Sequence, residues 1–152
     1  MTNEELKEKI SALLPDAVWE ENPQWLTVGI AAGQWRELAQ KLRHDSGFYF
    51  DYLFCVTGVD WKTHFTMVYH LQSSTHNHIL EVKARIDDRE KPTIDSVAEI
   101  WRTAEFHERE AYDLFGIRFT NHPDLRRLFL TEDWKGWPLR KDYEDDVNMI
   151  KL

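Results

Sequence analysis

Three runs of aromatic and β-branched residues follow one another in the middle of the chain and constrain its fold more than any other feature. They are YFDYLFCVTGVD (residues 49–60), HFTMVYHLQS (residues 64–73) and HNHILEVKARI (residues 76–86), with polar turns between them. Aromatic and β-branched side chains favour the extended backbone of a strand. Three such runs in series predict an antiparallel meander.

Helical segments are predicted on both sides of this meander. In residues 3–14 the apolar side chains recur at the three- and four-residue spacing of an amphipathic helix, and Pro15 follows. Residues 32–47 show the same spacing and end at a glycine. Residues 91–116 are predicted to form a helical region that is broken near Trp101.

A hairpin is predicted before the second helix, in residues 17–30, with Asn22 and Pro23 in the turn. Helices that flank a run of strands favour an α+β fold. We therefore expect a single α+β domain in residues 1–121, in which helices cover a small, mainly antiparallel sheet. We expect residues 122–152 to form an extended C-terminal tail.

The tail keeps neither the helical nor the strand period for long, yet it holds many apolar side chains, among them Trp134 and Trp137. Segments exposed to solvent rarely carry so much apolar surface. Trp and Arg are also enriched among the residues that contribute most to protein interfaces. The tail therefore either wraps its own domain or lies along another protein, and the second interpretation is favoured.

The segment WRTAEFHEREAYDLF (residues 101–115) places a carboxylate on the apolar face of a helix. At 100° per residue, Glu108 falls in the middle of the apolar stripe, whereas Glu110 points to the opposite side. Arg109 lies one turn from both Glu105 and Asp113 and can pair with either.

A carboxylate such as Glu108 must find a partner, because burying an isolated charge costs several kcal/mol. Arg126, Arg127 and Arg140 of the tail are the expected partners, since guanidinium binds carboxylate through two parallel hydrogen bonds. The favoured interpretation is a structural charge clamp that holds the tail on the helix. Its members would be Glu108, Arg109, Glu110 and Asp113. The alternative is a general acid with a raised pKa.

Other chemistry finds little support in the sequence. His76 and His78 would point the same way on a strand, but two ligands do not make a metal site. Cys55 lies in an apolar run and is expected to be a buried core residue. The chain contains no phosphate-binding P-loop, no dinucleotide-binding GxGxxG and no GxSxG nucleophile turn.

The composition excludes further classes of protein. A formal net charge of −8 argues against binding to nucleic acid or to anionic lipid. A single cysteine allows no disulfide within the chain and no cluster held by four thiolates. The run MTNEELKEKI lacks the apolar core of a signal peptide, and no apolar run approaches the ~20 residues that span a bilayer. We therefore expect a soluble chain.

The segment EREAYDLFGIRFTNHPDLRRLFL (residues 108–130) resembles the signature of the 30-kilodalton subunit of respiratory complex I, which in bacteria is the C subunit of NADH:quinone oxidoreductase. The segment EDWKGWPLRKDY (residues 132–143) also follows this family, whereas Phe129 and Thr131 depart from its usual pattern. The positions that match the signature are Glu108, Arg109, Glu110, Asp113, Leu114, Phe115, His122, Arg126 and Leu128.

The resemblance implies a non-catalytic subunit without cofactor, catalytic residues or metal ligands, in the hydrophilic arm of an ion-translocating NADH:quinone oxidoreductase. Such a subunit would lie peripherally on the cytoplasmic side of the cell membrane and support electron transfer from NADH to quinone. The 49-kilodalton-type subunit, known in bacteria as the D subunit, would be its main neighbour, with the B subunit close by. The tail would contact the 49-kilodalton-type subunit through His122, Arg126, Arg127, Trp134, Trp137, Arg140, Lys141 and Tyr143.

Three alternatives remain open. The chain could be the equivalent subunit of a membrane-bound hydrogenase or of a ferredoxin- or F420-linked oxidoreductase, because nothing in it contacts the electron donor. It could be a free acid/base or metal-dependent enzyme that uses Glu108, Glu110 and the histidines. It could also be a stand-alone adaptor.

Overall fold

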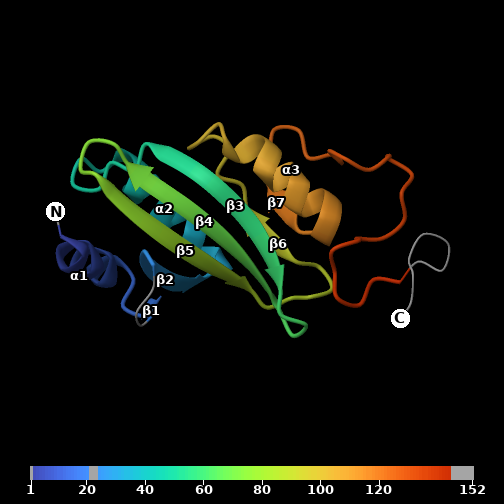
Figure 1. Ribbon diagram of the computed structural model, residues 1–152, viewed down its shortest axis with the longest axis horizontal. Helices are drawn as coiled ribbons and strands as arrows, with labels where there is room; N and C mark the ends of the chain where they lie inside the picture. Colours follow the sequence, from blue (N-terminus) through green and yellow to red (C-terminus); the bar gives the residue numbers. More distant parts are fainter. Residues whose placement is uncertain (1, 21–23, 145–152) are drawn as a thin grey trace.

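The computed structural model describes residues 2–20 and 24–144 (Figure 1). The elements along the chain are α1 (Asn3–Leu13), β1 (Val18–Trp19), β2 (Leu26–Ala31), the 3-10 turn η1 (Ala32–Gln34), α2 (Trp35–His44), β3 (Tyr52–Asp60), β4 (Phe65–Ser73), β5 (His78–Ile86), β6 (Thr93–Asp95), α3 (Ala104–Phe115) and β7 (Arg118–Thr120).

The predicted meander is confirmed. Strands β3, β4 and β5 pair antiparallel, and the five-stranded sheet has the order β1-β2-β5-β4-β3. Strands β1 and β2 form the predicted antiparallel pair, although the expected turn at Asn22 and Pro23 lies outside the described residues. Strand β2 runs parallel to β5, with Val28 opposite Val82. This parallel contact joins segments far apart in the sequence, so local patterns could not predict it.

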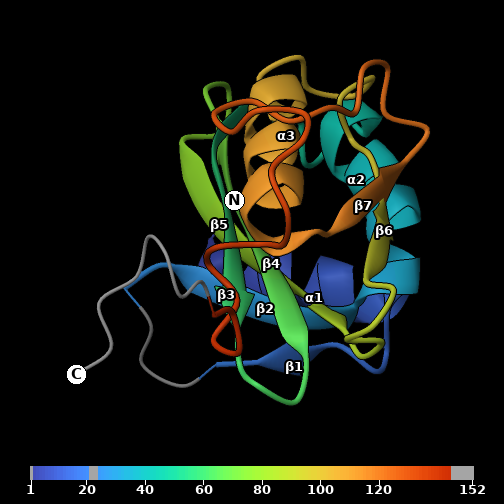
Figure 2. The same ribbon diagram turned by 90° about the vertical axis from the view of Figure 1, so that its right-hand side faces the viewer.

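The three α-helices cover one face of this sheet (Figures 1 and 2). Along β5, Leu80, Val82 and Ala84 are fully buried, whereas Glu81 and Lys83 between them are half-buried on the other face. These strand residues share one hydrophobic core with Leu6 of α1 and Leu38 of α2, and with side chains of α3. The alternation of buried and open positions follows from the two-residue period of a strand. The predicted α+β fold, with a mainly antiparallel sheet covered by helices, is confirmed.

The prediction for residues 91–116 is wrong in its first part. Thr93–Asp95 forms strand β6, which pairs parallel with β7, and the helix begins only at Ala104. Ile94 of β6 and Phe119 of β7 face each other in register, and both are buried. The extended conformation of β6 depends on β7, which follows α3 in the sequence, so the pairing exists only in the folded chain.

Cys55 is half-buried and does not belong to the core, contrary to the expectation. The register between β3 and β4 shifts between Leu53 and Cys55, and a shift of this kind changes which side chains face the core. Leu53 and Val56 are therefore both buried, while Cys55 lies on the open face beside Thr57.

None of the helices in the described part of the chain combines the length and apolar character needed to cross a bilayer.

Candidate functional site

The tail, described here as residues 122–144, runs along α3 and around the end of the sheet (Figure 2). Residues 145–152 of the predicted tail lie outside the described residues. Its path is determined by a small number of buried polar groups, most of them on α3.

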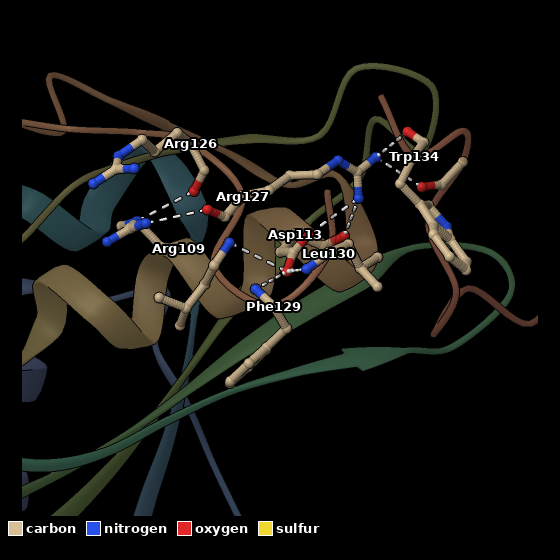
Figure 3. Close-up of polar contacts among 9 residues, drawn as sticks. Arg109, Asp113, Arg126, Arg127, Phe129, Leu130 and Trp134 are labelled. Atoms are coloured by element: carbon tan, nitrogen blue, oxygen red, sulfur yellow. Dashed lines mark hydrogen bonds and ion pairs between the residues drawn. The ribbon is translucent and has the colours of Figure 1, made fainter. Parts of the chain in front are cut away.

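Asp113 forms the first anchor of the tail. Its side chain is fully buried, and Oδ2 accepts hydrogen bonds from three consecutive backbone N–H groups (Figure 3). These belong to Leu128 at 3.2 Å, Phe129 at 2.7 Å and Leu130 at 3.1 Å. Successive N–H groups that converge in this way form a concave anion site. The carboxylate of the helix therefore holds a turn of the tail.

Arg127 binds the other oxygen of the same carboxylate. Its Nη1 donates to Asp113 Oδ1 at 3.0 Å, and its Nη2 donates to the carbonyl oxygens of Trp134 and Gly136, both at 3.0 Å. The guanidinium also lies 4.5 Å from the ring centroid of Trp137, in a cation–π contact. One side chain thus ties together α3 and two separate stretches of the tail.

The hydrogen bonds determine the charge of Asp113. Burial acts to raise its pKa, but the bonds from the Phe129 and Leu130 N–H groups and from Arg127 stabilise the ionised form. The pKa of Asp113 is consequently below its ordinary value of 3.8. The carboxylate is therefore ionised at neutral pH.

Arg109 is the second contact between α3 and the tail. Its Nε donates to the carbonyl oxygen of Arg126 at 3.2 Å, and its Nη2 donates to that of Arg127 at 3.1 Å. The sequence predicted an ion pair of Arg109 with Glu105 or Asp113, and the structure shows backbone carbonyls of the tail in their place. A buried guanidinium has several donors in a fixed plane, so it can bind two neighbouring carbonyl groups at once.

His122 marks the start of the tail and is bound on both ring nitrogens. Its Nδ1 accepts the N–H of Asp124 at 2.9 Å, so Nε2 carries the proton that it donates to the carbonyl oxygen of Glu105, also at 2.9 Å. The neutral ring is needed for this arrangement, because a protonated Nδ1 has no lone pair to accept a hydrogen bond.

Asp60, at the end of β3, forms an anchor at the far end of the tail. It receives two hydrogen bonds from Arg89, at 2.5 and 2.9 Å, and the N–H of Lys141 donates to its Oδ2 at 2.8 Å. The bonds from Arg89 hold the pKa of Asp60 far below its usual value of 3.8, even though burial opposes this shift. Asp60 gave no signal in the sequence, because its partners lie 29 and 81 residues away.

The tail also supplies partners for the C-terminus of α3. The N–H of Leu139 donates to the carbonyl oxygen of Leu114 at 2.9 Å, and Arg140 Nε donates to that of Phe115 at 2.6 Å. The last carbonyl groups of a helix have no partner within it, and basic side chains there complement the helix dipole.

Gly116 ends the helix and makes room for the tail. Its φ of +75° lies in the left-handed region that glycine adopts without strain. A Cβ atom at this position would lie 2.6–2.8 Å from atoms of the Trp137 ring. Only glycine therefore satisfies both the backbone and the packing of Trp137, which also contacts the ring of Tyr112.

Glu108 is fully buried as predicted, but the prediction that it pairs with an arginine of the tail is wrong. Its carboxyl group accepts hydrogen bonds from Ser96 Oγ at 2.6 Å and from the N–H of Val97 at 3.2 Å. Burial raises its pKa from 4.5 to about 7, although these two hydrogen bonds act in the opposite direction. Ser96 and Val97 lie between β6 and α3 and gave no signal in the sequence.

Glu110 faces away from Glu108, as the helical spacing predicted, and lines a small pocket with His107. Of the four proposed clamp residues, Arg109 and Asp113 bind the tail, whereas Glu108 binds the segment after β6.

The residues proposed for a partner interface are divided between two environments. Arg127, Trp137 and the side chains of His122 and Arg140 contact the protein's own helix α3. The remaining residues lie farther out: Arg126 is exposed and paired with Asp124, Lys141 has an exposed side chain, and Trp134 and Tyr143 are half-buried.

The residues considered for metal binding do not converge in the described part of the chain, where no group of three or more His, Cys, Asp and Glu side chains is arranged to hold an ion. The rings of His76 and His78 stack with their centroids 6.3 Å apart. His76 Nε2 instead contacts the carbonyl oxygen of Ser46 at 2.9 Å.

The fold and the site together define an α+β protein whose C-terminal segment is held on its own third helix by buried carboxylate and guanidinium groups. Residues 28–147 match the model of the family described as the 30 Kd subunit of the respiratory-chain NADH dehydrogenase. The chain belongs to this family.

Curated relatives carry matching names. The NADH-quinone oxidoreductase C subunit of Chloroherpeton thalassium is 48% identical over 112 residues, which cover 72% of this chain and 46% of that protein. The C subunit of a Roseiflexus species is 37% identical over 147 residues, or 93% and 84% of the two chains. The NADH-quinone oxidoreductase C/D subunit of Phocaeicola vulgatus is 45% identical over 126 residues, which cover 82% of this chain and 24% of that protein. The chain therefore spans about a quarter to a half of the length of two of these relatives.

A solved structure extends the comparison to three dimensions. A chain of the membrane-bound sulfane sulfur reductase, an archaeal respiratory membrane complex, has a TM-score of 0.77 and 26% sequence identity to this protein. The match covers 93% of this chain and 85% of that one.

Proposed function

We propose that this chain is a non-catalytic subunit, without a cofactor of its own, in the hydrophilic arm of an ion-translocating NADH:quinone oxidoreductase. In this role it supports the subunits that form the quinone site while electrons pass from NADH to quinone. It lies on the cytoplasmic side of the membrane and associates with the bilayer through the complex. The 49-kilodalton-type subunit is its main neighbour, and the B subunit lies nearby.

The observation that carries this proposal is the anchored tail. Three backbone N–H groups and one guanidinium converge on Asp113, so the tail follows a defined path over α3. A segment ordered before binding loses less conformational entropy when a partner docks on it. The exposed side chains of Arg126, Phe129, Leu139 and Lys141 are thus presented on a fixed backbone.

Relatives whose names combine two subunits support the 49-kilodalton-type D subunit as the neighbour. Proteins named as C/D subunits, in Phocaeicola vulgatus and in Bacteroides thetaiotaomicron, contain a region that matches this chain at 45% and 41% identity. Two subunits named on a single polypeptide favour a direct contact between the corresponding separate chains.

A second candidate is the equivalent subunit of a complex with another electron donor, such as a membrane-bound hydrogenase or a ferredoxin-linked oxidoreductase. The structural similarity to a chain of the sulfane sulfur reductase favours it. The identities of 37–48% to chains named as the C subunit of NADH-quinone oxidoreductase favour the first proposal over this one.

Purification of a tagged chain from gently solubilised native membranes tests the proposal, with mass spectrometry of the proteins that accompany it. We expect a 49-kilodalton-type subunit, a B-type subunit and an NADH-oxidising flavoprotein. A large nickel-bearing subunit in place of the flavoprotein would favour the second candidate. Recovery of the chain alone would contradict both.

A further inference from the structure

A pocket of about 120 Å³ lies between the outer face of α3, the middle of β3 and the tail. Apolar side chains form most of its wall, and the polar groups are few. The residues that line it are Val56, Thr57, Gly58, His107, Glu110, Ala111, Leu114, Phe115 and Leu139.

Glu110 brings an unpaired carboxyl group to this pocket. It is half-buried, and among residues 2–20 and 24–144 no hydrogen bond or ion pair is made by its side chain. The two other carboxylates on this part of the helix, Glu108 and Asp113, have all their partners within the protein. A partly desolvated carboxylate is stabilised when a binding partner places a cation beside it.

Two arginines of the tail have partners away from Glu110. Arg127 binds Asp113, and Arg140 binds the end of α3. Arg109, the neighbour of Glu110 on the helix, binds backbone carbonyls of the tail. None of these three guanidinium groups therefore pairs with the Glu110 carboxyl group.

Two large apolar side chains near the pocket are exposed. Phe106, one turn before Glu110 on α3, is 57% exposed, and Leu139 in the pocket wall is 52% exposed. Large apolar side chains around a charged group favour a protein surface over a small solute as the occupant. The volume agrees with this choice, because small-molecule sites usually measure ~300 Å³ or more.

We propose that this pocket receives one lysine or arginine side chain of the 49-kilodalton-type partner. The aliphatic stem lies on Val56, Ala111 and Leu139, and the cationic group reaches the Glu110 carboxylate. Leu139 belongs to the tail, so the pocket is continuous with the surface proposed above for the same partner. The inference rests on the proposed function and adds to it the chemistry of one contact.

Co-expression of the full chain with the 49-kilodalton-type subunit provides the test, with the dissociation constant measured at two salt concentrations. Glu110→Gln removes the charge with little change in shape. Glu105→Gln, on the same helix but outside the pocket, is the matched control. We expect Glu110→Gln to weaken binding tenfold or more and to reduce its dependence on salt, since truncating one partner of a buried charge pair is costly. Glu105→Gln should bind like the parent.

Charge reversal makes the test specific. Glu110→Lys should abolish binding, and replacing one basic residue of the partner by glutamate should restore it. Both Glu110 variants should unfold at the parent's temperature, because the side chain makes no hydrogen bond or ion pair within the described chain. Equal binding by the parent and Glu110→Gln would overturn the pocket proposal alone. Failure of the parent itself to bind the partner would overturn the proposed function, and the pocket proposal with it.

Discussion

Glu108, Glu110 and Asp113 lie close together on one helix, yet their carboxyl groups meet three different surroundings. Hydrogen-bond donors of the tail stabilise the ionised form of Asp113. Glu108 accepts only two hydrogen bonds, and its surroundings are apolar. Glu110 has no partner among the described residues and faces a pocket at the surface. The environment, and not the residue type, determines the opposite pKa shifts of Glu108 and Asp113.

Replacing Glu108 with glutamine should stabilise the protein at alkaline pH. The folded-state pKa of about 7 lies above the ordinary value of 4.5, so the folded state favours the protonated form. The parent therefore loses stability as the pH rises from about 4.5 to 7, by roughly 3 kcal/mol in total. Glu108→Gln has no such titration and should exceed the parent in free energy of unfolding at pH 8 but not at pH 4.5.

Urea denaturation at both pH values measures this difference, with Glu105→Gln as the control. A gain for Glu108→Gln of the same size at pH 4.5 and pH 8 would show that ionisation of Glu108 is not its cause.

A few side chains hold the tail on α3, and each of them makes several hydrogen bonds. Within residues 122–144 the tail forms no helix or strand, and several of its backbone groups bind side chains instead. Asp113 accepts hydrogen bonds from three of its N–H groups, and Arg109 and Arg127 donate to four of its carbonyl groups. Loss of one such side chain leaves several buried groups without partners at once.

Asp113→Asn should therefore release the tail locally. The change removes the ion pair with Arg127 and weakens three hydrogen bonds, at a cost of about 2–4 kcal/mol. We expect faster hydrogen exchange at the amides of residues 128–130 and faster proteolysis within residues 122–144. Asp124→Asn is the control, because Asp124 pairs with Arg126 at the exposed surface. Unchanged exchange at residues 128–130 in Asp113→Asn would contradict the anchoring role.

Two carboxylates that bind different parts of the tail make its attachment to the domain depend on pH. Asp113 on α3 and Asp60 on β3 both have a pKa below the ordinary 3.8, so each stabilises the folded state above that value. Their contribution is lost as the pH falls below about 4 towards the folded-state pKa values.

Burial lowers the pKa of His78, which makes a small loss of stability begin as the pH falls through 6.5.

The free energy of unfolding should accordingly fall steeply below pH 4, and the tail should detach in the same range. Urea denaturation between pH 2.5 and pH 5 tests this, with Asp113→Asn as the comparison. The variant should lose less stability than the parent over this interval, because one of the two titrating anchors is absent. Parallel curves for the two proteins would exclude Asp113 as a source of the acid sensitivity.

The meander, the first two helices, the helix of residues 104–115 and the family were all accessible from the sequence. Each depends on side-chain periodicity or on fixed spacing within a short segment, and such signals survive without knowledge of the fold. The orientation of Glu108 towards the core and of Glu110 away from it followed from the same helical period.

Only the tertiary structure decided the parallel contact of β2 with β5, the pairing of β6 with β7, and the partners of Glu108 and Asp113. It also showed that the tail contacts its own domain, with Asp60 and Gly116 among the residues that make this possible. These features depend on groups brought together from distant parts of the chain. A buried carboxylate binds whichever donors the folded backbone places beside it, and no local pattern in the sequence specifies those donors.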